Sequence, residues 1–434
     1  MPEDTGSSSI EYDDIDKLHS EKIRLDTLFS RRAKGLQASE IRELLKLTQK
    51  PDIISFAGGL PNPITFPSEQ LNEITSEVIK QNGKLAFQYG TTEGHVPLRQ
   101  EIAQWMNKRF GTNLDEANIL ITSGSQQGLL IVAHLFINSN DTIITSNPTY
   151  LGGIGAFNAF RADIETVTLD NDGMHIENLE ELLISLDRKK VKVKFIYVIP
   201  TFQNPTGVTL SEPRRKRLID LAEAYDTMVV SDNPYSELRY KGEPHSPLIA
   251  LDDGTHVTYL GTFSKTLVPG LRIAWMAGSV EFLKKAILCK QSLDLCTNPF
   301  NQYIVAEYMN RGLLDPHIKK ICKIYKEKLE IMLNAMDEFF PNEVDWTRPE
   351  GGLFTWATCP EHINTRELFE QAIIEKVAYV TGSAFFPNGG GENTMRINFS
   401  HPTNEKIHEG VRRLGKVLEN AIKKPKTQEV ITGI

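Results

Sequence analysis

The stretch GTFSKTLVPGLR, residues 261–272, joins two apolar runs, HVTYLGTF before it and LRIAWMAG after it. The first run is typical of a β-strand. Gly261, Pro269 and Gly270 exclude a regular helix from the segment that follows. Lys265 therefore lies just beyond a predicted strand end, on a tightly turning backbone. Partial burial would lower the pKa of its amine and make it a nucleophile toward carbonyl carbon.

A hydroxyl and a guanidinium flank this lysine. Thr262 stands three residues before it and Arg272 seven residues after it, and both groups suit a phosphate. An amine that attacks an aldehyde, beside donors for a phosphate, fits pyridoxal 5'-phosphate. The alternative is a solvated surface lysine, as most loop lysines are. This segment alone leaves both interpretations open.

The composition is that of an ordinary globular protein, with 434 residues, 40% hydrophobic and 24% charged. A formal net charge of −8 argues against nucleic acid as the main partner, because phosphate binding needs a basic surface. No apolar run approaches the ~20 residues of a membrane span, and the N-terminus lacks the apolar core of a signal peptide. The four cysteines show no zinc-ligand spacing, so free, buried thiols and no metal site are expected. These features fit a cytoplasmic protein with no membrane partner.

Apolar runs alternate with helix-like segments over most of the chain. The runs NILIT, DTIITS, VKFIYVIP, TMVVSD and HVTYLGTF are continuous rather than alternating. Strands that are apolar on both faces and separated by helices indicate an α/β fold with a mostly parallel sheet covered by helices. We expect a large domain at 66–330. Residues 21–65 and 331–434 are expected to form a smaller α+β domain, and the acidic residues 1–20 a disordered tail.

Polar residues follow several of these runs, where ligands bind in open parallel sheets. Ser125 and Gln126 in GSQQ open a helix, whose free N–H groups could bind an anion; the alternative is a simple helix cap. Asp232 in SDNPY could bond a protonated pyridine nitrogen, or it could only form a turn. The paired glycines Gly58 and Gly59 allow a ligand to approach the backbone closely.

The remaining candidates also have a structural alternative each. Asn204 and Tyr235 could donate to the phenolic oxygen of a pyridoxal ring, or be an Asn-Pro turn and a packed tyrosine. Tyr150 offers a face for stacking on a ring, and Tyr89 lies in a loop that could be ordinary surface. Arg396 stands within an apolar strand pattern, where its partner is either a substrate carboxylate or an internal acid.

Taken together, the motifs NPTG, SDNPY, TFSKTLVPGLR and MRINF, in this order, resemble the fold type I pyridoxal-phosphate aminotransferases of class I/II. The segments ASEIRELLKLTQ, SFAGGLPNP, QYGTTEG, TSGSQQG and FFPNGGGENTMR are similar to the branch that contains α-aminoadipate aminotransferase and kynurenine aminotransferase II. The resemblance spans about residues 35–420. It implies the fold type I architecture and pyridoxal 5'-phosphate as cofactor.

The resemblance also implies a role for each candidate. Lys265 is similar to the lysine that holds the cofactor covalently, Asp232 to the pyridine partner, and Tyr150 to the stacking residue; these three are the expected catalytic residues. The expected phosphate ligands are Ser125, Gln126, Thr262 and Arg272, with Tyr89 of a second subunit. The expected ring-oxygen donors are Asn204 and Tyr235. The expected substrate contacts are Arg396 on the α-carboxylate, with Asn204, Gly59, Ser39 and Arg42.

The implied activity is a transaminase that moves an amino group from an L-amino acid, of the 2-aminoadipate or aromatic type, to 2-oxoglutarate by a ping-pong mechanism. The implied assembly is a homodimer with shared active sites. Arg42 would meet a distal carboxylate or swing aside for an apolar side chain. Three alternatives stay open: a β-lyase, decarboxylase or cyclopropane-forming synthase with the same cofactor; a ligand-sensing domain of a transcription regulator; and a lysine aldolase without a phosphate cofactor. The amino donor also stays open among aminoadipate, aromatic, kynurenine and branched-chain substrates.

Overall fold

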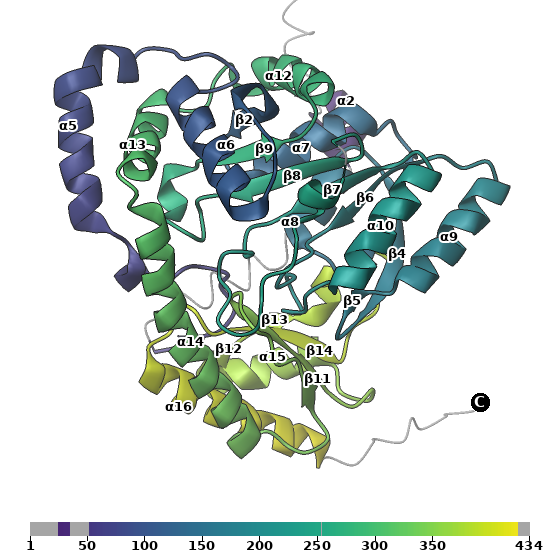
Figure 1. Ribbon diagram of the computed structural model, residues 1–434. Helices are drawn as coiled ribbons and strands as arrows, with labels where there is room; N and C mark the ends of the chain where they lie inside the picture. The colour runs from purple at the N-terminus through teal and green to yellow at the C-terminus, as the bar shows by residue number, and fades with distance from the viewer. Residues whose placement is uncertain (1–24, 35–51, 253, 424–434) are drawn as a thin grey trace, which may run out of the picture. The chain divides into compact units, whose positions relative to one another are not determined.

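The computed structural model describes residues 25–34, 52–252 and 254–423. Of the first of two units, residues 1–37, the structure describes α2 (Leu25–Leu28) and α3 (Arg31–Lys34). All other elements belong to the second unit, residues 38–434 (Figure 1). The predicted tail, residues 1–20, lies outside the described residues.

An eight-stranded sheet carries the strands that the apolar runs predict. Its order is β2-β9-β8-β7-β6-β3-β4-β5. The strands are β2 (Ile119–Thr122), β3 (Thr142–Asn147), β4 (Asp163–Asp170), β5 (Gly173–Met174), β6 (Val193–Val198), β7 (Met228–Asp232), β8 (Val257–Thr262) and β9 (Ala274–Ala277). Strands β8, β7, β6, β3 and β4 pair in parallel, and β9 lies antiparallel between β2 and β8. The prediction of a mostly parallel sheet is confirmed.

Both faces of this sheet are covered by helices. Along β2, Ile119 and Ile121 pack into one hydrophobic cluster, and Leu120 between them packs into another. Because successive side chains of a strand point to opposite faces, the two clusters lie on the two sides of the sheet. Residues of α5 (Ser68–Ala86), α6 (Val96–Phe110), α9 (Ile176–Arg188), α10 (Glu212–Ala224), α11 (Leu248–Leu251) and α13 (Pro299–Asn310) join the first cluster. Residues of α7 (Ser125–Phe136), α8 (Leu151–Asn158) and α12 (Val280–Asp294) join the second.

Strands β4 and β5 are the part of the sheet that the apolar runs do not predict. In β4, Ile164 and Val167 are buried, whereas Asp163 and Thr168 are exposed. An outer strand with one wetter face carries charged and hydroxyl residues, so it forms no continuous apolar run. Strand β5 then turns back antiparallel on β4 and ends the sheet.

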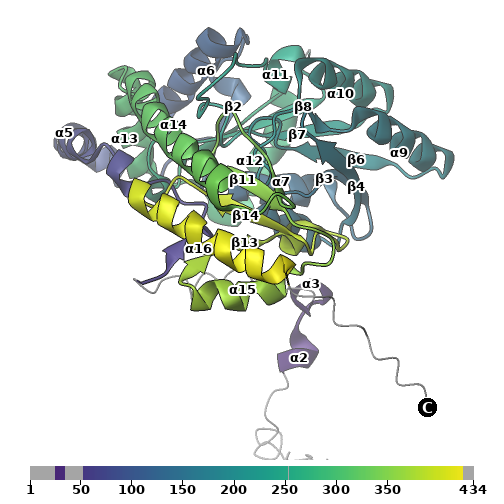
Figure 2. The ribbon, with the colours of Figure 1, turned by 90° about the horizontal axis from the view of Figure 1, so that it is seen from below.

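A second, four-stranded antiparallel sheet has the order β10-β11-β14-β13. Its strands are β10 (Asp345–Trp346), β11 (Phe354–Thr358), β13 (Val380–Thr381) and β14 (Thr394–Asn398). A parallel pair joins β1 (Ile54–Ser55) to β12 (Val377–Ala378), so a segment before residue 65 pairs with the C-terminal region. Helix α15 (Thr365–Ile374) packs here, and α14 (Leu314–Phe339) lies along α16 (Asn404–Ile422) (Figure 2). Helix α14 runs through residue 330, the predicted end of the large domain. The domain boundaries stay predictions.

Single helical turns are found at η1 (Pro63–Thr65), η2 (Glu116–Asn118), η3 (Pro269–Leu271) and η4 (Gly382–Phe385). The cysteines Cys289, Cys296, Cys322 and Cys359 are free thiols; Cys289 and Cys359 are buried, as predicted, whereas Cys296 and Cys322 are only half-buried. None of the helices in the described part of the chain has the length and apolar character needed to cross a membrane.

Candidate active site

The strands that run in one direction end at the same edge of the large sheet, and a cavity of about 460 Å³ lies there. It is reached by residues that follow β2, β3, β6, β7 and β8, and by residues of β11 and β14. The predicted residues that line it are Gly59, Ser125, Gln126, Tyr150, Asn204, Asp232, Tyr235, Thr262, Lys265, Arg272 and Arg396. Residues far apart in the chain therefore meet as the strand-end argument predicts.

Three predicted residues are not part of this lining. The side chain of Tyr89 is 79% exposed and does not line the cavity. Its predicted contact with the site of a second subunit stays a prediction. Ser39 and Arg42 lie outside the described residues.

Lys265 extends from the turn after β8 into the cavity. Its Nζ donates a hydrogen bond of 2.8 Å to the carbonyl oxygen of Gly59. Burial lowers the pKa of the Lys265 amine to about 8, and the positive charges of Arg396 and Arg272 act in the same direction. A substantial fraction of this amine is therefore neutral near pH 8, as a nucleophile or a base requires.

Asp232 ends β7 and is 2% exposed. Its Oδ2 accepts a 2.9 Å hydrogen bond from the hydroxyl of Tyr197, whereas its Oδ1 is buried without a partner among the described residues. Burial raises the pKa of this carboxyl to about 7, and the Tyr197 hydrogen bond only partly opposes that rise. A cationic donor placed at Oδ1 would stabilise the carboxylate.

The turn between β2 and α7 presents donors to one end of the cavity. Ser125 Oγ is buried with no partner in the described structure, at the first residue of α7. Gly124 precedes it with φ of 84°, and a Cβ there would lie 2.2 Å from Nη2 of Arg272. Arg272 donates only to Ser264 Oγ and the Pro269 carbonyl, and it forms no ion pair with a described carboxylate. A helix N-terminus with an unpaired guanidinium suits a phosphate.

Arg396 lies in the middle of β14 and is 6% exposed. Its Nη1 donates to Asn204 Oδ1 over 2.8 Å and its Nη2 to the Ala57 carbonyl over 2.9 Å. The guanidinium carbon lies 4.3 Å from the ring centroid of Phe354 and 5.1 Å from that of Phe385. No described acid pairs with it, and its Nε is buried without a partner. The internal salt bridge is therefore not seen, and the guanidinium is available to a ligand carboxylate.

Three further polar side chains, those of Asn204, Tyr235 and Tyr150, line the cavity. Asn204 Nδ2 lies 3.5 Å from the hydroxyl of Tyr235, whose ring packs edge-on against Phe354. Tyr150 is the residue just before α8, and burial, followed by the charge of Asp232, raises the pKa of its hydroxyl. All three side chains keep neutral hydrogen-bonding groups at neutral pH.

These residues fit pyridoxal 5'-phosphate. The unpaired Arg272, the bare Ser125 hydroxyl and the start of α7 suit its phosphate. The orphaned Oδ1 of Asp232 suits a protonated ring nitrogen, and the Lys265 amine suits an aldehyde carbon. The donor set thus matches three separate groups of one cofactor, and a second guanidinium, Arg396, remains for a substrate carboxylate.

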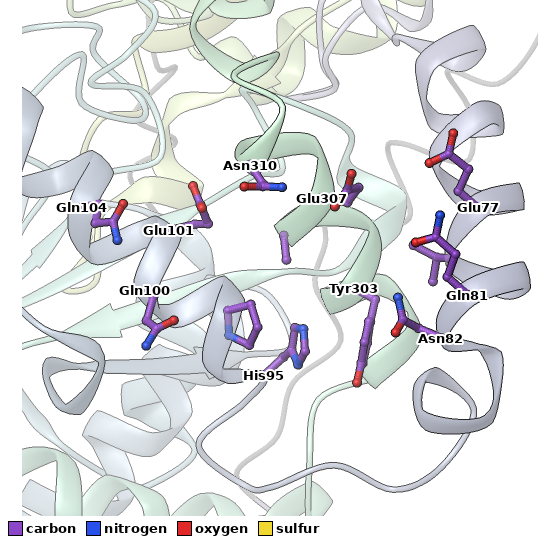
Figure 3. Close-up of a pocket in the computed structure, with 13 residues that line it drawn as sticks. Glu77, Gln81, Asn82, His95, Gln100, Glu101, Gln104, Tyr303, Glu307 and Asn310 are labelled. Carbon is purple, nitrogen blue, oxygen red and sulfur yellow. The ribbon is translucent and has the colours of Figure 1, made fainter.

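A cavity between α5, α6 and α13 has the opposite character (Figure 3). The carboxylates of Glu77, Glu101 and Glu307 line its roughly 440 Å³, together with carboxamides and a stacked His95–Tyr303 pair. Burial and the neighbouring Glu307 raise the pKa of Glu101. No lysine or arginine is among the described residues that line this cavity, so it offers a phosphate none of the cationic donors that line the cavity around Lys265.

Sequence reasoning missed several residues of the site. Tyr197 stands inside the apolar run of β6, where a tyrosine is typical of packing, yet its hydroxyl holds Asp232. Ser264 donates its backbone N–H to Thr262 Oγ1 and lies beside Arg272; it adjoins Lys265 in the sequence, a signal that could have found it. Phe354 in GGLF gave no signal, because its contact with Arg396 joins two strands that are neighbours in the sheet but far apart in the sequence.

Comparison with known proteins gives a consistent result. Residues 62–414 match the family described as "Aminotransferase class I and II". The chain is 49% identical over 416 residues to aromatic-amino-acid aminotransferase 1 of Thermococcus litoralis, covering 95% of this chain and 100% of that protein. It is 46% identical to the solved kynurenine aminotransferase of Pyrococcus horikoshii in complex with PMP, with a TM-score of 0.90 and coverage of 92% and 99% of the two chains.

A third relative is LysN, the α-aminoadipate aminotransferase of Thermus thermophilus, solved in complex with N-(5'-phosphopyridoxyl)-L-leucine. It is 38% identical, with a TM-score of 0.85 and coverage of 92% of this chain and 99% of that one. These structures confirm the predicted fold type I α/β class, and the names of the three relatives confirm the predicted likeness to the aminoadipate and kynurenine branch. The chain belongs to the class I and II aminotransferases.

Proposed function

We propose that the enzyme transfers the amino group of an aromatic or 2-aminoadipate-type L-amino acid to 2-oxoglutarate in a ping-pong cycle. The observation that carries this proposal is one cavity with a depressed-pKa lysine, an unpaired carboxylate oxygen and two arginines without acidic partners. The aminotransferase activity itself follows from the family. The donor, the acceptor and the order of the half-reactions are the proposed part.

The predicted cofactor is confirmed as pyridoxal 5'-phosphate by the family and by solved relatives that carry pyridoxyl groups. When bound, it accepts the amino group at its aldehyde carbon and withdraws electron density from the substrate Cα. We propose that Ser125, Gln126, Thr262 and Arg272 hold its phosphate, and that Asp232 and Tyr150 hold its ring.

The residues of the chain divide the remaining work. Arg396, steadied by Asn204 and Ala57, binds the substrate α-carboxylate and so orients the Cα–H bond. The Nζ of Lys265 would take the proton from the substrate Cα and deliver it to the carbon that the cofactor aldehyde supplies, which requires an amine whose pKa lies near the working pH. Asp232 stays ionised beside a cationic ring nitrogen and thereby stabilises electron density drawn from Cα.

Apolar residues in the lining of the cavity support a substrate with an apolar or aromatic side chain. Leu60, Leu151, Ile199 and Phe354 are among them. The cations in the described lining are Lys265, Arg272 and Arg396, and each already has a proposed partner. A distal carboxylate, as in 2-aminoadipate, therefore needs another cation. We propose Arg42, from the segment 35–51.

Arg396→Lys is expected to lower kcat/KM for any amino acid substrate about 100-fold, mainly through KM. Lysine keeps the charge but loses the forked pair of donors, and charge-assisted hydrogen bonds contribute roughly 1.5–3 kcal/mol each. Steady-state kinetics with L-phenylalanine measures the change. Arg348→Lys, at an arginine paired with Asp337 on the surface, is the matched control and should stay within about twofold. An unchanged KM in Arg396→Lys would remove Arg396 from the carboxylate site.

Arg42→Ala is expected to lower kcat/KM for 2-aminoadipate at least about tenfold, because a charge-assisted hydrogen bond to the distal carboxylate is lost. The same variant should handle L-phenylalanine within about twofold. Lys46→Ala removes a cation from the same segment and is the control. Equal losses with both substrates in Arg42→Ala would contradict the proposed contact.

A donor panel tests the proposed function as a whole. L-Phenylalanine, L-kynurenine, L-2-aminoadipate and L-leucine are each supplied with 2-oxoglutarate, and glutamate is measured. Aromatic donors or aminoadipate should give glutamate, with parallel lines in double-reciprocal plots. Release of ammonia or carbon dioxide without glutamate would instead identify a lyase or a decarboxylase. A purified protein without a bound chromophore would favour the aldolase.

We propose that the enzyme acts as a homodimer in the cytoplasm. Leu85, Phe87 and Tyr89 are 65%, 65% and 79% exposed in one short segment, and such apolar surface is typical of an interface. A second copy of the chain is the proposed occupant, with its Tyr89 at the phosphate.

A further inference from the structure

The turn between β2 and α7 has a second face that does not line the active-site cavity. Ser125 and Gln126 point into the cavity, whereas Ser123 and Gln127 are absent from its lining. The Ser123 hydroxyl donates a 3.0 Å hydrogen bond to Asp294 Oδ2. The Ser123 backbone N–H donates over 2.8 Å to Gln127 Oε1, and the Gln127 side chain also bonds Asp294. The carboxylate of Asp294 therefore binds the turn on the face that does not line the cavity.

That carboxylate is held in turn by a buried lysine. Lys290 is 0% exposed, and its Nζ donates a 2.8 Å hydrogen bond to Asp294 Oδ1, one helical turn further along α12. Helix α12 packs against α7 (Figure 1). Burial alone would raise the pKa of Asp294, but hydrogen bonds from Lys290, Gln127 and Ser123 outweigh burial and lower it. Asp294 is therefore a carboxylate at neutral pH, with both oxygens engaged.

Stability alone does not account for this arrangement. Lys290 is fully buried whereas the Asp294 side chain is 25% exposed, so forming this pair costs desolvation free energy mainly at the lysine, and a pair of apolar residues of similar volume is often as stable. What the pair adds here is a defined geometry. The side chains of Lys290, Ser123 and Gln127 all donate to the two carboxylate oxygens of Asp294. The turn needs such precision, because Gly124 lies so close to Arg272 that a Cβ would reach 2.2 Å from Nη2. A small displacement of the turn would change the distance between the Ser125 hydroxyl and that guanidinium.

We propose that Asp294, neutralised by Lys290, is a positioning residue that locks Ser123 and Gln127 so that the turn 123–126 presents its donors to the cofactor phosphate. Asp294 touches neither cofactor nor substrate in this account; it acts through the turn. The inference rests on the phosphate contacts in the proposed function and adds the element that fixes them.

The test compares two ligands that differ only in the phosphate. The full-length protein is freed of cofactor and titrated with pyridoxal 5'-phosphate and, separately, with pyridoxal, and binding is followed by absorbance. Asp294→Asn is expected to weaken pyridoxal 5'-phosphate about tenfold, because charge-assisted hydrogen bonds to the turn are lost. Pyridoxal, which has no phosphate to place, should change less than about twofold. Glu330→Gln, which breaks the exposed Lys326–Glu330 pair on α14, is the control and should change neither.

Two further variants guard against a folding defect, because Asp294→Asn leaves Lys290 buried without its counter-charge. Ser123→Ala removes one hydrogen bond and no charge, and Lys290→Met with Asp294→Leu replaces the pair by apolar residues. Both should show the same phosphate-selective weakening. Equal weakening of both ligands, or no weakening in these variants, would overturn the positioning role. A wild-type protein that does not prefer pyridoxal 5'-phosphate to pyridoxal would contradict the proposed phosphate site itself, which separates the two failures.

Discussion

Lys265→Ala is expected to lower kcat by about 10⁴-fold or more. This substitution removes both the attacking amine and the group that moves the Cα proton, and each role is worth several orders of magnitude. Lys265 is the one lysine in the described lining of the cavity, so no neighbouring amine can replace it. Glutamate production from the best donor of the panel measures the loss.

Two control variants make this result specific. Lys241→Ala removes an exposed lysine and should leave kcat within about twofold. Lys265→Arg keeps a positive charge in the cavity but offers no neutral amine, so it should be as inactive as the alanine variant. Activity within tenfold of wild type in Lys265→Ala would mean that another residue performs the proton transfer.

Asp232→Asn is expected to lower kcat about 10²–10³-fold, the size seen when a key electrostatic group is removed from an active site. In the wild-type protein the Tyr197 hydroxyl donates to Asp232 Oδ2 over 2.9 Å, and the amide oxygen of asparagine can still accept this hydrogen bond. It cannot supply the negative charge that keeps a ring nitrogen protonated. The variant therefore removes the negative charge at residue 232 and keeps the shape of the side chain. Near-native turnover would contradict the proposed bond between Asp232 and the protonated ring nitrogen.

The same substitution should stabilise the protein when the cofactor is absent. The folded state raises the pKa of Asp232 from 3.8 to about 7, mainly by burial, so the folded state binds this proton more tightly than the unfolded state does. Stability is then lost as pH rises from about 4 to about 7, by up to roughly 4 kcal/mol at 1.36 kcal/mol per pH unit. Asparagine has no charge to bury and avoids this loss.

Urea unfolding of the cofactor-free proteins measures the difference. Asp232→Asn should be more stable than wild type at pH 8 and nearly equal to it at about pH 4. Asp187→Asn, at an exposed carboxylate, is the control and should show no such pH dependence. A cofactor-free Asp232→Asn protein that is less stable than wild type at pH 8 would show that the unpaired Oδ1 carries no penalty.

The part of the site that lies at strand ends could be predicted from the sequence. Asp232 and Lys265 each follow a continuous apolar run, and parallel strands bring their carboxyl ends to one edge. Arg396 was detectable because a guanidinium inside an apolar strand requires a partner. Periodicity and composition were sufficient there, because each of these reactive side chains lies where a regular apolar pattern ends or is interrupted.

Contacts between distant segments could not be predicted in this way. Tyr197 looks like any packed strand residue until its hydroxyl is seen on Asp232. The ion pair of Lys290 and Asp294 reads as a common helical i,i+4 pair, and only the fold brings it against Ser123. Such contacts depend on how helices pack over the sheet, and no local pattern encodes that packing.

The central claim is that a pyridoxal cofactor is attached to this chain at Lys265, and chemical trapping tests it most directly. The purified holoenzyme is treated with sodium borohydride and digested, and the peptide that carries a phosphopyridoxyl group is identified by mass spectrometry. The account predicts one labelled peptide, with the group on the lysine of Ser264-Lys265-Thr266. A label on any other lysine, or no label at all, would contradict it.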